Sequence, residues 1–88
     1  ETVRVLDFIQ LSERLTISKL LVPEKLVGKT VVESDLRSRF GLNIIAIANG
    51  ANVMENVKPD YSFCKGDIPF LSGSRDGLLN LSEWSEEQ

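Results

Sequence analysis

Residues 31–50 read VVESDLRSRFGLNIIAIANG, and this run predicts a helix, a stop, a strand and a hairpin turn in succession. Its first half places Val32, Leu36 and Phe40 four residues apart. On a helix over 31–40 these side chains would form one apolar stripe, because residues four apart lie on the same helical face. The sequence therefore predicts a helix that packs this stripe against the core.

The predicted helix has recognisable signals at both ends. Thr30 and Glu33 have the T-x-x-E spacing of a capping box at its start. Gly41 is expected to end it in the left-handed conformation that glycine adopts easily. Two acid-before-base pairs would add about 0.2–0.5 kcal/mol each: Glu33 with Arg37, and Asp35 with Arg39.

A strand is predicted over 42–48, where LNIIAIA is almost continuously apolar and Asn49-Gly50 gives a strong hairpin signal. Alternation would place Ile45 and Ile47 on one face and Ile44, Ala46 and Ala48 on a shallower one, with Asn43 near the entry. A second sheet, a partner subunit or a flat ligand would fit the shallow face. An ordinary two-sided core strand explains the same pattern.

Further strands are predicted over 15–22, 51–57 and 68–72. Residues 3–11 are interpreted as a connector or strand that leads into the domain. Pro69 favours an edge position for the last strand, or an amide that faces away from the ladder. A closing helix is expected to bury Leu78, Leu81 and Trp84 and to fray at its acidic end. The order strand, helix, hairpin, strand, helix indicates a small α+β domain.

Composition and charge narrow the function classes. With 88 residues the chain forms one small domain, near the size at which a single core is only marginally stabilising. Association with a copy of itself or with a missing part of a larger protein is therefore expected. The formal charge of −3 comes from the acids of residues 83–88, and residues 1–82 are neutral. This argues against nucleic acid as a partner, since phosphate binding needs a concentrated basic surface. No apolar run approaches the roughly 20 residues that span a bilayer, so direct membrane insertion is not expected.

Reactive side chains are few. The sequence has no histidine and one cysteine, Cys64. This excludes an internal disulfide, zinc sites built on imidazole, and nucleophile pairs that use histidine. The remaining nucleophile candidate is Cys64 beside Lys65, and such a pair is more often an incidental neighbour in a turn. We therefore expect neither an enzyme nor a metal site.

Together these motifs resemble the C-terminal subdomain of the regulators of potassium conductance, the TrkA-C or RCK-C domain, over residues 15–81. The resemblance rests on a Leu-x-Gly-Lys-Thr helix entry, an Asp-hydrophobic-Arg step, a Phe-Gly pair, an Ile-Ile-Ala-Ile strand, Lys65-Gly66-Asp67-Ile68 and Gly73. The N-terminal DFIQLSE is similar to the connector that precedes this subdomain in Ktr-type subunits. The resemblance implies a dimeric β-α-β-β-β-α domain at 15–82, a connector over 1–14 from an N-terminal lobe, and an acidic tail at 83–88.

For function, the resemblance implies a cytoplasmic piece of a regulator that acts on a potassium channel or transporter subunit at the inner face of the cell membrane. It also implies a receptor for cyclic di-AMP, bound between two copies of the domain. Carrying the family's site over residue by residue gives Val31, Asp35, Leu36, Arg37, Asn43, Ile44 and Pro59. No G-x-G-x-x-G is present, so neither NAD nor ATP nor another cofactor is assigned to these residues.

The types of these residues suit an anionic purine ligand. Val31, Ile44 and Pro59 offer flat apolar contacts to a base. Arg37 and Asn43 offer a cation and amide donors to a phosphodiester. Asp35 would accept from a base or ribose donor. Ordinary roles stay open as well: core for Val31 and Ile44, a solvated ion pair for Arg37, a strand-entry contact for Asn43 and a turn for Pro59.

Three features of the sequence depart from the Ktr pattern. Ala48-Asn49 stands where a basic residue or pair often precedes the hairpin glycine, Asn52 takes a place that can be histidine, and Pro69 interrupts the last strand. The first two argue against an anionic dinucleotide. Two functions therefore stay open: a sensor of cyclic di-AMP or another small anion, and a structural dimerisation or gating-ring module with no ligand of its own.

Overall fold

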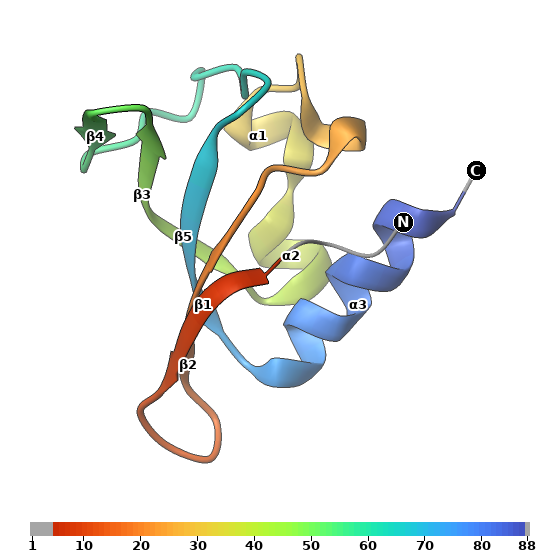
Figure 1. The fold of residues 1–88 in the computed structure, drawn as a ribbon. Coiled ribbons are helices and arrows are strands. Elements are labelled where there is room, and N and C mark those ends of the chain that lie inside the picture. Colours follow the sequence, from red (N-terminus) through yellow and green to blue (C-terminus); the bar gives the residue numbers. More distant parts are fainter. Residues whose placement is uncertain (1–4, 88) are drawn as a thin grey trace.

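A computed structural model describes residues 5–87 and shows an antiparallel sheet with the helices α1, α2 and α3 on one side of it (Figure 1). The sheet has five strands in the order β1-β2-β5-β3-β4. In chain order the elements are β1 (Val5–Gln10), β2 (Thr16–Leu20), the 3-10 turn η1 (Glu24–Leu26), α1 (Val31–Ser34), α2 (Leu36–Phe40), β3 (Asn43–Asn49), β4 (Asn52–Met54), β5 (Ile68–Gly73) and α3 (Arg75–Glu86). The predicted α+β architecture is confirmed.

Three segments differ from the prediction. The return strand predicted over 51–57 is the short β4 (Asn52–Met54). Residues 5–10 form β1, an edge strand that pairs with β2 in the same sheet. The closing helix α3 continues to Glu86, through most of the acidic segment predicted as a tail.

The core lies between the sheet and the helices. Leu20, Ile47 and Leu71 point onto it from β2, β3 and β5, and each is at most 3% exposed. Leu36 of α2 and Leu81 of α3 meet them from the helical side. Full burial of such a side chain contributes about 1.5–3 kcal/mol, so this one cluster is the main source of stability.

Of the two alternatives predicted for the last strand, the edge position is wrong, because β5 lies between β2 and β3. Pro69 is opposite Ile47 of β3 and is almost fully buried. On the other side, the ladder to β2 ends with the pair of Lys19 and Phe70, and Phe70 directly follows Pro69 in the chain. The proline therefore stands where the β2 ladder has already ended.

β3 does not alternate as predicted, because its register against β5 shifts between Ile44 and Ala46. Ile45 lies in this irregularity and is 43% exposed, whereas Ile47 is 3% exposed. Ile44 packs against the same core cluster that contains Ile47. A bulge adds one residue and reverses the alternation beyond it. The prediction that Ile45 and Ile47 share a face is therefore wrong.

The single helix predicted over 31–40 is two short helices joined at Asp35, which has φ 50° and ψ 39°. A left-handed residue changes the direction in which the following side chains point. The predicted apolar stripe consequently does not form, since Val32 is 65% exposed while Leu36 is 4% exposed. Ser34 is buried instead, and its hydroxyl donates to the Val31 carbonyl at 2.6 Å.

Both predicted ends of this helical segment are confirmed. The Thr30 hydroxyl accepts from the Glu33 N–H at 3.1 Å, and Glu33 Oε1 accepts from the Thr30 N–H at 2.9 Å. Gly41 ends α2 with a left-handed φ of 68°. The local sequence signals therefore predicted both ends of the helical segment correctly, although they did not predict the break at Asp35.

The two predicted ion pairs do not form among the described residues. The Glu33 carboxylate is used by the capping box, and Arg37 turns into the cleft described below. The Arg39 guanidinium lies over the Trp84 ring, 4.5 Å from its centroid. The break at Asp35 disrupts the helical spacing between Glu33 and Arg37, on which the first pair depended.

Candidate ligand-binding cleft

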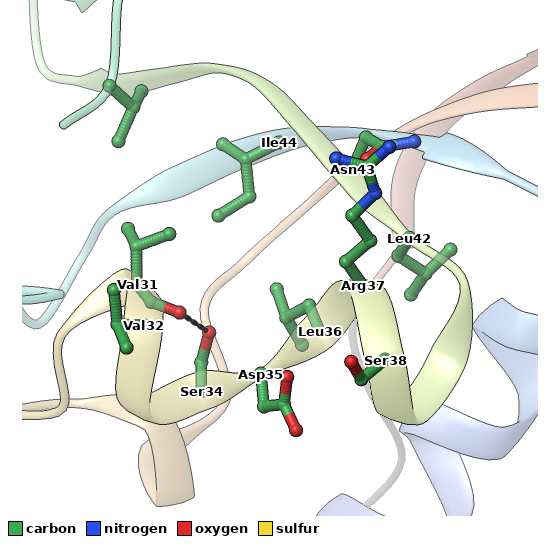
Figure 2. Close-up of a pocket in the computed structure, with 11 residues that line it drawn as sticks. Val31, Val32, Ser34, Asp35, Leu36, Arg37, Ser38, Leu42, Asn43 and Ile44 are labelled. Carbon is green, nitrogen blue, oxygen red and sulfur yellow. Dashed lines mark hydrogen bonds between the residues drawn. The ribbon is translucent and has the colours of Figure 1, made fainter. Parts of the chain in front are cut away.

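A cleft of about 400 Å³ opens between the two short helices and the start of β3 (Figure 2). Its volume lies within the range of roughly 300–1,000 Å³ that is usual for small-molecule sites. Six of the seven residues predicted from the sequence line it. The lining residues are Val31, Val32, Ser34, Asp35, Leu36, Arg37, Ser38, Leu42, Asn43, Ile44 and Val57.

Arg37 and Asn43 supply the polar groups of this cleft. Both residues are exposed, and Figure 2 shows the Arg37 side chain extending from α2 toward Asn43, the first residue of β3. Within residues 5–87 the Arg37 guanidinium has no hydrogen bond or ion pair. Its planar set of N–H donors therefore faces solvent and is available to an anion.

Apolar side chains form the rest of the lining. Three of these residues are half-buried and pack against the core cluster, which holds their side chains in place: Val31, Ile44 and Val57. Leu36 is 4% exposed and belongs to the core itself. Such a surface can contact the face of a planar ring, while the guanidinium lies beside it.

Pro59 does not line the cleft. It is exposed, and its carbonyl accepts from the Val32 N–H at 3.1 Å, so it ties the following loop to the start of α1. Val57 lines the wall in its place. Sequence reasoning missed Val57, although an apolar residue between Asn56 and Lys58 was an available signal.

Asp35 lines the cleft at the joint between α1 and α2. Its N–H donates to the carbonyls of Val31 and Val32, at 3.3 and 3.2 Å. Its carboxylate is exposed and makes no capping hydrogen bond to α2. In Figure 2 this carboxylate points away from Arg37.

A buried carboxylate that sequence reasoning treated only as part of a turn fixes the nearby loop. Asp67 is 0% exposed. It accepts hydrogen bonds from Asn49 Nδ2 at 2.6 Å, the Tyr61 hydroxyl at 2.7 Å and the Cys64 N–H at 2.8 Å. Burial, together with the hydrogen bond to Asp67, raises the pKa of Tyr61. The Tyr61 carbonyl accepts from the Val31 N–H at 2.9 Å, so this group also holds the loop against the cleft.

Comparison with known proteins finds a family and two named relatives. The TrkA-C domain matches residues 15–85. The Ktr system potassium uptake protein C of Bacillus subtilis (strain 168) is 31% identical over 70 residues, which are 80% of this chain and 32% of that protein. The Ktr system potassium uptake protein A of the same organism is 30% identical over 74 residues, which are 84% of this chain and 33% of that protein. This chain thus spans about a third of the length of these curated relatives.

Solved structures share the fold. The crystal structure of the GsuK RCK domain matches with a TM-score of 0.82 at 25% identity, over 98% of this chain and 19% of that chain. The RCK C domain of the potassium transport protein KtrA, in complex with cyclic diadenosine monophosphate, matches with a TM-score of 0.72 at 30% identity, over 76% of this chain and 79% of that chain. The arrangement in Figure 1 is therefore that of an RCK C-terminal domain.

Two further properties concern residues 5–87. Each helix in this part of the chain is too short or too polar to cross a bilayer. The same residues contain no cluster of three or more cysteine or acidic side chains that could hold a metal ion.

Proposed function

Because this chain belongs to the TrkA-C domain family, we propose that it is the ligand-sensing part of a regulator of potassium transport. The relatives are named as potassium uptake proteins of the Ktr system. In this proposal the domain works in the cytoplasm, at the inner face of the membrane, and passes its ligand state to a potassium channel or transporter subunit. The proposal contains no catalytic step.

The proposed ligand is cyclic di-AMP, bound between two copies of the domain. The observation that carries this proposal is the cleft, which brings a free guanidinium, an amide and apolar side chains together in about 400 Å³. A volume toward the lower end of the range for ligand sites, roughly 300–1,000 Å³, is expected if each copy encloses one half of a two-fold ligand. The KtrA domain that was solved with this ligand supports the choice.

In the proposed complex, Arg37 and Asn43 donate to a phosphate, and Val31 and Ile44 contact an adenine. Arginine suits this role because its fork of donors matches two phosphate oxygens at once. A symmetric ligand meets the same residues in both copies, so its binding free energy fixes the distance and angle between them. A gating assembly can transmit that change of geometry to a membrane subunit.

A second function, a structural dimerisation module without its own ligand, has one observation in its favour. Arg37 is the sole cation among the residues that line the cleft. Ala48 and Asn49 add no positive charge at the hairpin. A ligand with two phosphates would then meet one arginine from each copy and no further cation from this lining.

Isothermal titration calorimetry of the purified domain with cyclic di-AMP decides between these functions. We expect heat of binding, and we expect Arg37→Ala to weaken it by about 1.5–3 kcal/mol, the scale of a hydrogen bond to a charged group. Stability should change little, since Arg37 is exposed and unpaired within the described residues.

The matched control is Arg75→Ala, which removes the same charge from an exposed residue at the start of α3, outside the cleft. It should bind like the wild type. Absence of heat, together with an unchanged melting temperature in millimolar ligand, would leave the structural module. Binding that survives both Arg37→Ala and Asn43→Ala would keep the ligand and reject this cleft.

A further inference from the structure

We propose that Asp35 is a positioning residue, whose left-handed backbone turns Arg37 into the same cleft as Val31. The inference rests on the proposed function for its ligand readout. In this proposal the backbone of Asp35 has the functional role, whereas the residue type alone would suggest its carboxylate.

The geometry of an uninterrupted helix would separate these two side chains. Val31 and Arg37 are six residues apart. At about 100° per residue, they would project about 120° apart around one helix axis. Because the Leu36 side chain is buried in the core, Val31 and Arg37 would then lie on different flanks of that helix. In the structure both line one cleft, and Asp35 is the residue between them that departs from helical geometry (Figure 2).

Asp35 stands out among residues 5–87 as the one non-glycine residue with a positive φ. L-residues adopt this conformation at a cost, and such residues persist where their surroundings fix them. Here backbone hydrogen bonds on both sides of Asp35 hold this conformation. The Asp35 N–H donates to the Val31 and Val32 carbonyls, and its own carbonyl accepts from the Arg39 N–H at 3.0 Å.

The side chain of Asp35 takes no part in this arrangement. It makes no capping hydrogen bond, it is exposed, and it points away from Arg37. Aspartate and asparagine tolerate the left-handed conformation better than most L-residues, and glycine adopts it freely. β-branched residues do so with most difficulty. The identity that matters at position 35 is therefore tolerance of positive φ rather than negative charge.

The test compares Asp35→Asn, Asp35→Gly and Asp35→Val by calorimetry with cyclic di-AMP. We expect Asp35→Asn and Asp35→Gly to keep the affinity within about twofold of the wild type, since both residues accept the left-handed conformation. Val should weaken binding on the order of tenfold or more, because the cleft then forms only at the cost of backbone strain. Leu79→Val controls for the effect of a β-branched residue in a helix, at an exposed position of α3.

Two calorimetric results would overturn the inference. If Asn and Gly lose as much affinity as Val, the carboxylate itself contacts the ligand. If Val binds like the wild type, the left-handed conformation is not needed. Should Asp35→Val fail to fold, Asp35→Ala takes its place, since alanine also accepts positive φ less readily than asparagine or glycine.

Nuclear magnetic resonance of the ligand-free domain separates this inference from the proposed function. The coupling between the amide and α protons of residue 35 depends on φ, and so does the distance between these protons. The amide shifts of Val31 and Arg37 should move in Asp35→Val and stay near wild type in Asp35→Gly. If no variant, including the wild type, binds cyclic di-AMP, the proposed function fails while this pattern still supports the role of Asp35. Equal shift changes in all three variants would reject it.

Discussion

Among the glycines, Gly77 is the one at which an added side chain would meet the closest neighbour. It lies in the first turns of α3, and a Cβ built there would overlap the Phe40 carbonyl oxygen. Glycine thus permits α3 to cross the end of α2 at backbone distance. Helix propensity alone would favour alanine at this position by about 1 kcal/mol.

We expect Gly77→Ala to destabilise the domain in spite of that propensity, by about 1–3 kcal/mol, the scale of an overpacked core. The partner atom is backbone and cannot move aside as a flexible side chain would. Chemical denaturation followed by circular dichroism measures the change. Asn80→Ala, at an exposed position of the same helix, should be neutral or stabilising. An increase in stability for Gly77→Ala would show that α3 and α2 do not approach this closely.

Tyr61 gives a prediction about pH. Burial and its hydrogen bond to Asp67 raise its pKa above the ordinary value of 10.0, so folding favours the neutral phenol. A group whose pKa is raised on folding contributes its stability fully below the unfolded value and loses it as the pH rises. We expect the free energy of unfolding to fall from about pH 10 upward.

The matched variant is Tyr61→Phe, which removes the ionisable group and the hydrogen bond to Asp67. It should be less stable than the wild type near neutral pH by about 1–3 kcal/mol, because Asp67 loses a donor while it stays buried. The difference between the two proteins should shrink above about pH 10, while lysine titration affects both alike. A difference that stays constant up to high pH would show that Tyr61 does not titrate with a raised pKa.

At the scale of elements, α3 is docked through the indole of Trp84. The Lys25 ammonium lies 4.8 Å from the ring centroid and donates to the Trp84 carbonyl at 2.6 Å. The Arg39 guanidinium lies 4.5 Å from the same centroid, and the Phe40 ring centroid is 6.0 Å away. One side chain therefore joins α3 to η1 and to α2.

We expect Trp84→Leu to lower the free energy of unfolding by about 1–3 kcal/mol, since it removes ring contacts with two cations and one aromatic ring. The loss should be concentrated in α3, which hydrogen exchange would detect as lower protection of residues 78–84. Leu79→Ala, in the same helix but exposed, should change stability by less than about 0.5 kcal/mol. Equal effects of the two substitutions would contradict the docking role of Trp84.

Sequence patterns predicted elements well where the signal was local. The capping box at Thr30, the stop at Gly41 and the hairpin turn depend on a few neighbouring residues. The structure shows the first two as predicted. It places the turn one residue later than predicted, at 50–51, because Asn49 still pairs with Asn52. The break at Asp35 and the bulge near Ile45 were not predictable in this way. Each requires a backbone conformation held by contacts from distant residues, and aspartate or isoleucine carries no specific signal for it.

The candidate site shows the same division. Six of its residues came from a motif that is local in sequence, and they line one cleft in the structure. Pro59 and Val57 lie in a long connection whose path is set by the buried Asp67 and by hydrogen bonds to α1. No periodicity describes such a loop, so the sequence did not indicate that Val57 lines the cleft and that Pro59 lies outside its lining.

At the scale of the whole molecule, one copy leaves much apolar surface uncovered. The helices cover one face of the sheet, and the edge strand β1 keeps Leu6, Phe8 and Ile9 between 45% and 60% exposed. A domain of 88 residues has little surplus stability of its own. Association of two copies would therefore bury apolar surface that a single copy leaves exposed, and this burial would stabilise the domain.

We expect a homodimer in sedimentation velocity experiments at about 10–100 µM, the range in which ordinary weak association becomes visible. A ligand that binds between two copies must also strengthen their association, because mass action couples the two equilibria. Saturating cyclic di-AMP should then lower the apparent dissociation constant of the dimer, and the gain should be lost in Arg37→Ala and kept in Arg75→Ala.

A folded monomer over this whole concentration range, with and without ligand, would reject the dimer. Binding of one ligand per chain with no change in association would place the ligand within a single copy, and the coupling to subunit geometry would then need another route.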